Sequence, residues 1–159
     1  MNSDITNDSF KWATETEDTD PIFFDNSDQL KEYVEQIMHQ QDGELAVFKY
    51  FGKTRRRWWS RIFIPGEYHW SVLYCFTIRW IEDFAVLMFY DAEANEHRAF
   101  DQLNYISDAS EDIRIRLGID EYSPASPEQC LQKSRVLDAC QEFIDTGNRP
   151  EWLNYECRV

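Results

Sequence analysis

Two segments of the chain have the hydrophobic spacing of an amphipathic helix. In residues 26–43, apolar side chains recur three and four positions apart, at Leu30, Tyr33, Val34, Ile37 and Met38. This spacing places them on one helical face. Asn26 or Ser27 is suited to cap the helix at its start, and Gly43 is suited to end it.

The second predicted helix covers residues 127–147, near the end of the chain. One side of its helical wheel is apolar and consists of Val136, Leu137, Ala139, Cys140, Phe143 and Ile144. Gly147 is placed to stop the helix in the left-handed conformation, and Pro150 prevents the helix from continuing.

Between and after these helices, the pattern is typical of strands. Strands are predicted at residues 44–51, 56–64, 69–80, 84–90 and 97–100, with turns at Gly52 and at residues 91–96. Residues 110–118 fit either a short helix or a strand. Residues 151–159 alternate again, and the alternation assigns Leu153, Tyr155 and Cys157 to the core. The pattern predicts an α+β fold, in which an antiparallel sheet meander carries an N-terminal and a C-terminal helix and ends in a short strand.

The length of 159 residues predicts one domain, at residues 21–159, preceded by a mobile acidic tail at residues 1–20 on which only Trp12 is suited to dock. The tail lacks the basic start and apolar run of a signal peptide, and no apolar stretch in the chain is long enough to cross a bilayer. The expected location is therefore the cytoplasm. There the four scattered cysteines, at positions 75, 130, 140 and 157, are expected to be reduced, apolar core residues.

Charge narrows the set of partners. Thirty acidic residues against 16 basic ones give a formal charge of −14, which disfavours nucleic acid and anionic membranes and favours basic partners. The segment 49–61 is the exception, because its lysines and arginines are interleaved with Trp58 and Trp59. It has two interpretations, a nucleic-acid stacking surface or a hairpin whose bases pair with the acidic remainder, and the net charge favours the second.

The residues that could carry chemistry form no recognisable constellation. No phosphate-binding glycine motif is present, and His39, His69 and His97 lack the spacing of metal ligands. Cys75 and His69 could be paired as nucleophile and base, but the alternation around Cys75 favours a buried structural thiol. Abundant carboxylates such as Glu82 and Asp83 carry no information by themselves. We therefore predict no catalytic residue, metal or cofactor, and a binding protein rather than an enzyme.

The turn that follows the last helix is the most informative motif. Its sequence, Thr-Gly-Asn-Arg-Pro at residues 146–150, follows a helix C-terminus, where the negative end of the dipole disfavours phosphate. We predict a structural cap in which Arg149 satisfies terminal carbonyls or pairs with a carboxylate. The segment resembles the hallmark of immunity protein family one of bacterial polymorphic toxin systems. The matching residues are Glu142, Phe143, Thr146, Gly147, Arg149 and Pro150, with Tyr155 at the position where a tryptophan is usual.

This resemblance implies a cytoplasmic antitoxin that binds and blocks one toxin domain in a one-to-one complex. The toxins that the resemblance implies act on nucleic acid, such as deaminases and nucleases, and the acidic charge of the chain predicts a basic toxin. The turn that the family shares is not expected to choose the toxin, so we expect the interface elsewhere on the surface. The candidate contacts are Asp91, Glu93, Glu96, Asp108, Glu111, Asp112, Asp120, Glu121 and Trp152. Two alternatives stay open, a non-inhibitory adaptor or chaperone for a secreted effector, and a hydrolase that uses Cys75 or a carboxylate.

Overall fold

The computed structural model describes residues 11–16, 19–55, 68–91, 93, 95–101, 109–118 and 123–158. Its centre is an eight-stranded sheet in which every pairing is antiparallel, in the order β2-β1-β3-β4-β5-β6-β8, with β7 paired to β5. The strands are β1 (Lys11–Thr16), β2 (Thr19–Phe24), β3 (Asp42–Arg55), β4 (Tyr68–Ile81), β5 (Phe84–Tyr90), β6 (Glu96–Phe100), β7 (Leu131–Gln132) and β8 (Asn154–Arg158). The predicted α+β class, with an antiparallel sheet and a short final strand, is confirmed.

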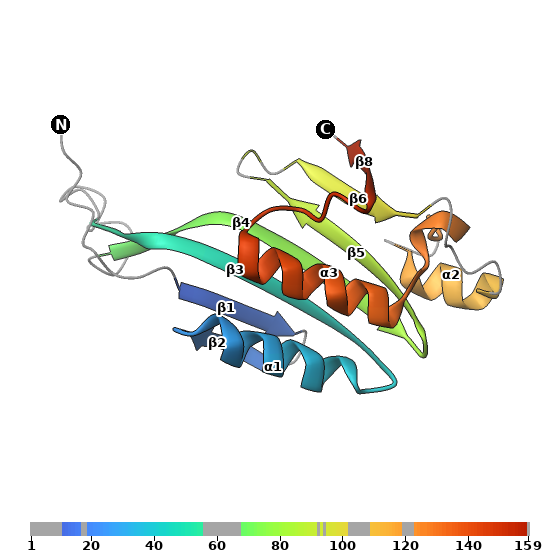
Figure 1. Ribbon diagram of the computed structural model, residues 1–159, viewed down its shortest axis with the longest axis horizontal. Coiled ribbons are helices and arrows are strands. Elements are labelled where there is room, and N and C mark those ends of the chain that lie inside the picture. The colour runs from blue at the N-terminus through green and yellow to red at the C-terminus, as the bar shows by residue number, and fades with distance from the viewer. Residues whose placement is uncertain are drawn as a thin grey trace.

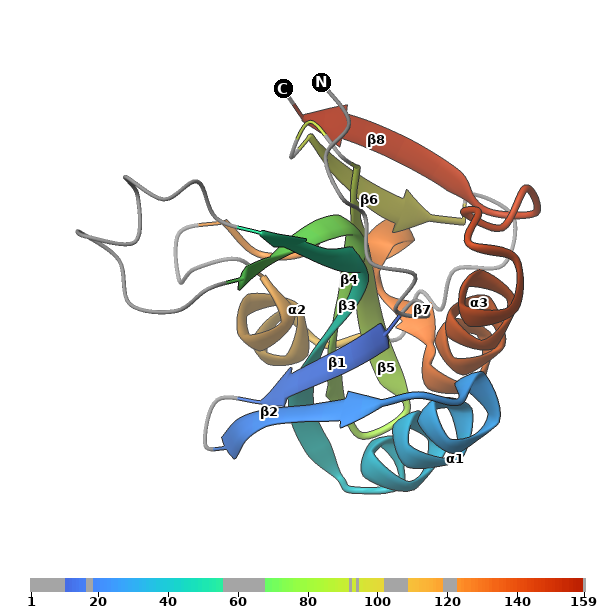
Figure 2. The ribbon, with the colours of Figure 1, turned by 90° about the vertical axis from the view of Figure 1, so that its left-hand side faces the viewer.

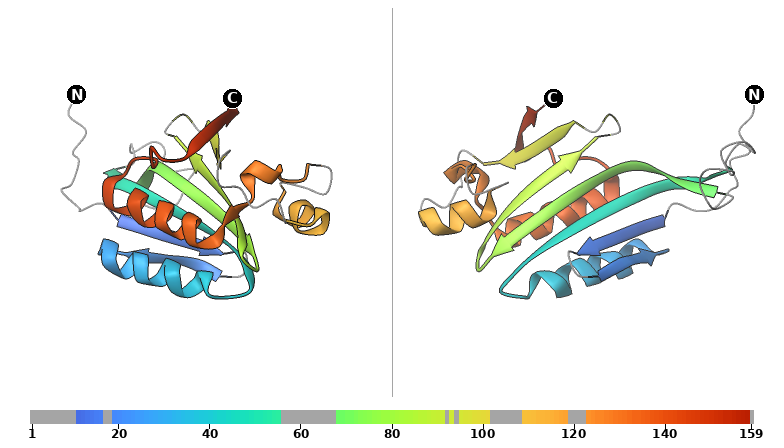
Figure 3. Two further views of the ribbon diagram at one scale, coloured as in Figure 1. Left: turned by 45° about the vertical axis from the view of Figure 1, so that its right-hand side comes forward. Right: turned by 180° about the vertical axis from the view of Figure 1, so that it is seen from behind.

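Three α-helices pack on this sheet: α1 (Ser27–Met38), α2 (Glu111–Leu117) and α3 (Lys133–Thr146). Helices α1 and α3 lie side by side on one face, and α2 lies on the other (Figures 1 and 2). Seen from behind, the second face carries α2 at one end only, and the long strands β3 and β4 cross it (Figure 3, right). We call this second face the open face of the sheet.

The main core lies between the sheet and the pair α1 and α3. Alternation along β4 creates it, because Phe76, Ile78 and Trp80 are buried on this side while Thr77 and Arg79 between them face the other way. Helix α1 contributes Leu30, Val34 and Met38 to the same core. A smaller cluster, formed by Ile81, Val86, Leu117, Ala125 and Cys130, fixes α2 to its end of the open face.

Helix α1 starts as predicted but ends earlier. The carboxamide oxygen of Asn26 accepts a hydrogen bond from the Asp28 backbone N–H at 2.7 Å, which caps the helix. Its last residue is Met38, and Gly43 lies inside β3. The reason for a glycine there is close packing, since a Cβ atom at this position would lie 2.5 Å from Cζ2 of the Trp80 ring. The prediction that Gly43 ends the helix is wrong.

Strand β3 runs through Gly52, where the sequence predicted a turn, and continues to Arg55. Its ladder with β4 is irregular between Tyr50 and Lys53, so the glycine is accommodated as a break in register. The predicted turn at Gly52 is therefore wrong. The predicted strand at residues 56–64 lies outside the described residues.

The predicted boundary between an acidic tail and the domain is corrected. Strands β1 and β2 form a hairpin that extends the sheet beyond β3, so the domain begins no later than Lys11. Trp12 is 4% exposed and meets the Phe143 ring edge-on at 6.5 Å, which confirms that it docks on the body. Backbone pairing and one buried indole outweigh the polar composition of this segment. Residues 1–10 lie outside the described residues.

The second predicted helix begins six residues later than expected. Residues Pro127–Gln129 form a short 3₁₀ turn, and Leu131 pairs with Ala85 of β5 before α3 begins at Lys133. Cys130, between these elements, has a non-helical backbone, with φ −80° and ψ 87°. In the part of the chain that the structure describes, no helix is long and apolar enough to span a membrane.

The cysteine prediction is confirmed for two positions. Cys130 and Cys140 are buried, and burial raises the pKa of Cys130 to about 11 and that of Cys140 well above its usual value. Cys157 is exposed on the edge strand β8, so its assignment to the core is wrong, whereas Leu153 is buried and Tyr155 half-buried as predicted. The side chain of Cys75 lies outside the described residues, as does that of His69.

Candidate functional site

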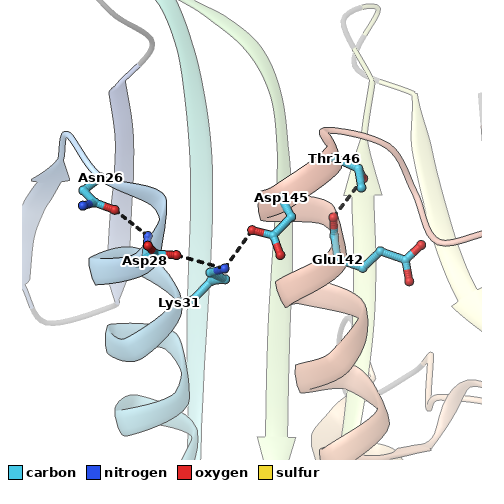
Figure 4. Close-up of polar contacts among 6 residues, drawn as sticks. All are labelled: Asn26, Asp28, Lys31, Glu142, Asp145 and Thr146. Atoms are coloured by element: carbon cyan, nitrogen blue, oxygen red, sulfur yellow. Dashed lines mark hydrogen bonds and ion pairs between the residues drawn. The ribbon is translucent and has the colours of Figure 1, made fainter.

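The turn at residues 146–150 closes the end of α3 with its own atoms. Gly147 adopts the left-handed conformation, with φ 72°, and donates its backbone N–H to the Phe143 carbonyl at 2.7 Å. The Thr146 hydroxyl donates to the Glu142 carbonyl at 2.8 Å (Figure 4). It also accepts from the Asn148 N–H at 3.1 Å. The predicted glycine cap is confirmed.

The aromatic side chains after the turn are tied back to α3. Trp152 is 40% exposed, but its indole N–H donates to the Glu142 carboxylate at 2.6 Å. The guanidinium of Arg135 lies over the same ring, 4.8 Å from its centroid, and it also pairs with the buried Asp101 at 2.8 Å. The predicted contact residue Trp152 is therefore exposed and held in one orientation.

Arg149 differs from the prediction. Its guanidinium lies over the Tyr155 ring, 5.0 Å from the centroid, rather than on terminal carbonyls or a carboxylate. The Tyr155 hydroxyl donates to the Pro150 carbonyl at 2.8 Å, and burial raises the pKa of this phenol above its ordinary value. The aromatic residue at this position of the motif thus joins β8 to the turn.

The left-handed cap supports a first prediction. Gly147→Ala should lower the free energy of unfolding by about 1 kcal/mol, because a Cβ atom crowds the backbone at positive φ. Gly147→Asn should cost clearly less, since asparagine tolerates this conformation. Urea unfolding followed by tryptophan fluorescence measures both variants, and equal costs for Ala and Asn would contradict the backbone explanation.

Asp91, a predicted contact residue, organises the turn between β5 and β6. Its carboxylate accepts hydrogen bonds from His97 Nε2 at 2.9 Å, from the Glu93 N–H at 2.9 Å and from the Asn95 N–H at 3.0 Å. These bonds, that from His97 first, hold the pKa of Asp91 well below its usual value. The carboxylate accepts these hydrogen bonds within its own turn, so its first role is to hold the shape of that turn.

A prediction for acid solution follows from this turn. A carboxyl group whose pKa is depressed by folding stabilises the fold above its unfolded pKa of 3.8 and loses that contribution as the pH falls toward its folded pKa. Below about pH 4, protonation should loosen the turn. Amide hydrogen exchange of Glu93 and Asn95, measured across pH 2–6 and corrected for intrinsic rates, checks this. In Asp91→Ala, which removes the acceptor, these two amides should exchange fast at every pH in that range.

The other predicted acidic contacts divide into three groups. Glu93, Glu111 and Asp112 are exposed, the last two in the first turn of α2. Glu96 is turned onto the open face, where it pairs with Arg98 at 2.5 Å. Asp108, Asp120 and Glu121 lie outside the described residues. The six predicted contacts that the structure describes come from the turn between β5 and β6 with the start of β6, from the first turn of α2, and from the segment before β8.

The open face carries a pocket that the sequence analysis did not predict, and we call it the open-face pocket. It has a cavity volume of about 200 Å³. Its floor consists of alternate residues of β4, β5 and β6, namely Thr77, Arg79, Val86, Met88, Glu96 and Arg98. Leu117, Gly118 and Ala125 cover one end. The available sequence signal was the alternation in β4, where Thr77 and Arg79 lie on the face opposite the core.

Ion pairs organise the charged groups of the open-face pocket. Arg79 pairs with Glu44 of β3 at 2.7 Å and donates to the Gly118 carbonyl, which ties the end of α2 to the sheet. Gly118 fits tightly there, because a Cβ atom would lie 2.3 Å from the Ser123 carbonyl oxygen. Each arginine of the pocket thus has a glutamate of its own, and the four charges sum to zero.

Charge over the whole described surface is one-sided. The exposed acidic side chains are Glu15, Asp20, Asp25, Asp28, Glu32, Glu35, Asp42, Glu82, Asp83, Glu93, Glu111, Asp112, Asp138, Asp145, Glu151 and Glu156. Among the same described residues, the exposed lysines and arginines are Arg116 and Arg149. Arg116 pairs with Asp42 at 3.3 Å, so even an exposed base is drawn to an acid.

Lys31 is an example of a basic side chain that pairs with acids of the same molecule. It lies between α1 and α3 and contacts Asp28 at 3.1 Å and Asp145 at 2.8 Å, so it bridges the two helices (Figure 4). Hydrogen bonding to Asp145, and then to Asp28, raises the pKa of the Lys31 ammonium. The Lys31 ammonium therefore offsets the negative charges of Asp28 and Asp145 on the two helices α1 and α3.

Among the described residues, no three His, Cys, Asp or Glu side chains are grouped so that they could hold a metal ion. No protein-family model and no curated protein matches the chain.

Proposed function

We propose that this protein is an immunity protein, an antitoxin that binds and inhibits one toxin domain secreted by a competing bacterium. The proposed toxin is a basic enzyme that acts on nucleic acid in the cytosol, such as a deaminase or a nuclease. The observation that supports this best is the one-sided charge of the described surface, where acidic side chains face outward and the basic side chains mostly contact acids of the same molecule.

The physical reason is complementarity with a nucleic-acid enzyme. Such an enzyme binds phosphates with a positively charged groove, and an acidic protein surface is attracted to the same groove. Steering of this kind raises association rates by a factor of about 10 to 10³. Fast capture benefits an antitoxin, because an uncaptured toxin damages its target with every turnover.

Trp152 supplies a second element of a binding surface. Tryptophan is among the residues that contribute most to protein interfaces. Because Glu142 and Arg135 already hold the indole, binding would cost little additional side-chain order. The motif at residues 142–155 thus combines architecture with one pre-positioned contact.

Co-expression tests the proposal directly. We expect the neighbouring reading frame to encode a protein with a toxic C-terminal domain. That domain should kill an expression host alone and be tolerated together with this protein. The purified pair should form a one-to-one complex without toxin activity. If neither rescue nor a complex were found, the proposal would be wrong. A stable complex with an active toxin would instead identify an adaptor or chaperone.

Salt tests the electrostatic part of the proposal. The association rate constant, measured by stopped-flow fluorescence, should fall on the order of tenfold between 50 mM and 500 mM salt. A flat salt response would remove charge complementarity from the explanation even if inhibition were confirmed.

Two matched double variants locate the contact. Glu111→Gln/Asp112→Asn on α2 and Glu32→Gln/Glu35→Gln on α1 remove the same number of exposed charges. Both should slow association, because steering depends on the total field. We expect only the α2 pair to accelerate dissociation as well, since contact residues act mainly through the dissociation rate. The reverse result would place the interface on the face of the sheet that α1 and α3 cover.

A further inference from the structure

The floor of the open-face pocket is ordered by strand register. Thr77 of β4 lies opposite Met88 of β5, and Met88 lies opposite Arg98 of β6. Opposed residues of antiparallel strands point to the same face, so these three side chains form one row across the pocket. The row has a polar group at each end and an apolar thioether in the middle.

Both polar ends of this row carry a buried atom without a partner. Neither Arg98 Nη2 nor Thr77 Oγ1 has a hydrogen-bond partner among the described residues. The Arg98 side chain is 8% exposed, and its Nε already donates to Glu96. Leaving such groups unpaired costs free energy, so their presence at a cavity indicates that something else pairs with them.

We propose that the open-face pocket binds a small, uncharged ligand that carries an amide group. Arg98 Nη2 can only donate, so it takes the amide carbonyl, while the Thr77 hydroxyl can accept from the amide N–H. The remainder of the ligand lies over Met88 and against Val86 and Leu117, which line the same cavity. The ligand would bind whether or not the protein inhibits a toxin.

The charge balance of the pocket selects an amide over a carboxylate. Arg79 and Arg98 are each neutralised by a glutamate, so a carboxylate ligand would leave one uncompensated negative charge. The formal charge of −14 on the whole chain adds to that repulsion. An amide supplies the acceptor that Arg98 requires without adding charge.

The volume limits the ligand to about one ring. A cavity of roughly 150 Å³ accommodates benzene, and the open-face pocket measures about 200 Å³. Benzamide is therefore a suitable probe, and benzoate is its charged counterpart of nearly the same shape. We expect benzamide to bind with a dissociation constant on the order of 1 mM, the range for a ligand of this size.

Titration of the ¹⁵N-labelled 159-residue chain, followed by NMR, tests this. Benzamide should shift the backbone amides around Thr77, Met88 and Arg98 saturably, and benzoate should bind on the order of tenfold more weakly. Absence of saturable benzamide shifts, or benzoate binding as tightly as benzamide, would overturn the proposal.

A pair of threonine variants separates ligand recognition from packing. Thr77→Val removes the hydroxyl in the pocket, and Thr14→Val removes another buried, unpartnered hydroxyl that lies in β1, away from the pocket. Thr77→Val should weaken benzamide binding about fivefold or more, and Thr14→Val should leave it unchanged. Equal effects of the two variants would show that the Thr77 hydroxyl does not contact the ligand. The spectra themselves report whether each variant is folded.

Discussion

Phe143→Ala is expected to lower the free energy of unfolding by about 3–5 kcal/mol, a large fraction of the stability of a domain of this size. Phe143 is 3% exposed, and its ring contacts Phe89 at 4.9 Å, Phe76 at 5.2 Å and Trp12 at 6.5 Å between centroids. One ring thus joins α3 to β4, β5 and β1. Urea unfolding, monitored by far-ultraviolet circular dichroism, measures the loss.

Phe23→Ala is the matched control for that experiment. Phe23 is 53% exposed on β2, so the same chemical change should cost less than about 1 kcal/mol. Comparable losses for the two variants would mean that Phe143 does not hold the layers together as its contacts indicate. An unchanged denaturant slope in both variants would show that the unfolded states remain comparable.

Gly43→Ala is expected to cost about 1–3 kcal/mol although it adds only one methyl group. The new Cβ atom would lie 2.5 Å from Cζ2 and 2.9 Å from Cη2 of the Trp80 ring. Trp80 is 1% exposed, and its indole N–H donates to the Gln40 carbonyl at 3.1 Å, so the ring has little freedom to move away. Chemical denaturation again provides the measurement.

A double-mutant cycle isolates the cause of that cost. In a Trp80→Leu background the two ring atoms are absent, so adding Gly43→Ala should then cost little or nothing. The expected coupling free energy is therefore about as large as the cost of Gly43→Ala alone. Additive losses would place the effect in the backbone of β3 rather than in contact with the indole.

The acidic surface and the open-face pocket depend on the same internal pairing of charges. Because Arg79, Arg98 and Arg135 are engaged by Glu44, Glu96 and Asp101, they do not offset the exposed acids of the described surface. The same pairs leave Nη2 of Arg98 and Nε of Arg135 without partners among the described residues. The same ion pairs therefore contribute to the negative electrostatic field of the molecule and leave two hydrogen-bond donors without partners.

Local spacing along the sequence determined the regular elements. The i, i+3, i+4 pattern from Leu30 to Met38 placed α1, and the alternation around Phe76, Ile78 and Trp80 placed β4, because each pattern has the period of its own element. Gly147 was assigned as the stop of α3 for an equally local reason, its tolerance of positive φ. The acidic balance was likewise a property of composition alone.

Tertiary structure alone decided which residues meet. Residues Lys11–Thr16, which include Trp12, form a strand only because the edge of β3 is available to pair with them. A glycine is needed at position 43 only because Trp80 lies against it. Asp91 accepts hydrogen bonds from its own turn, and the row from Thr77 to Arg98 exists only through strand register. Such contacts join residues far apart along the chain. The sequence fixes their chemistry, and only packing and pairing decide their neighbours.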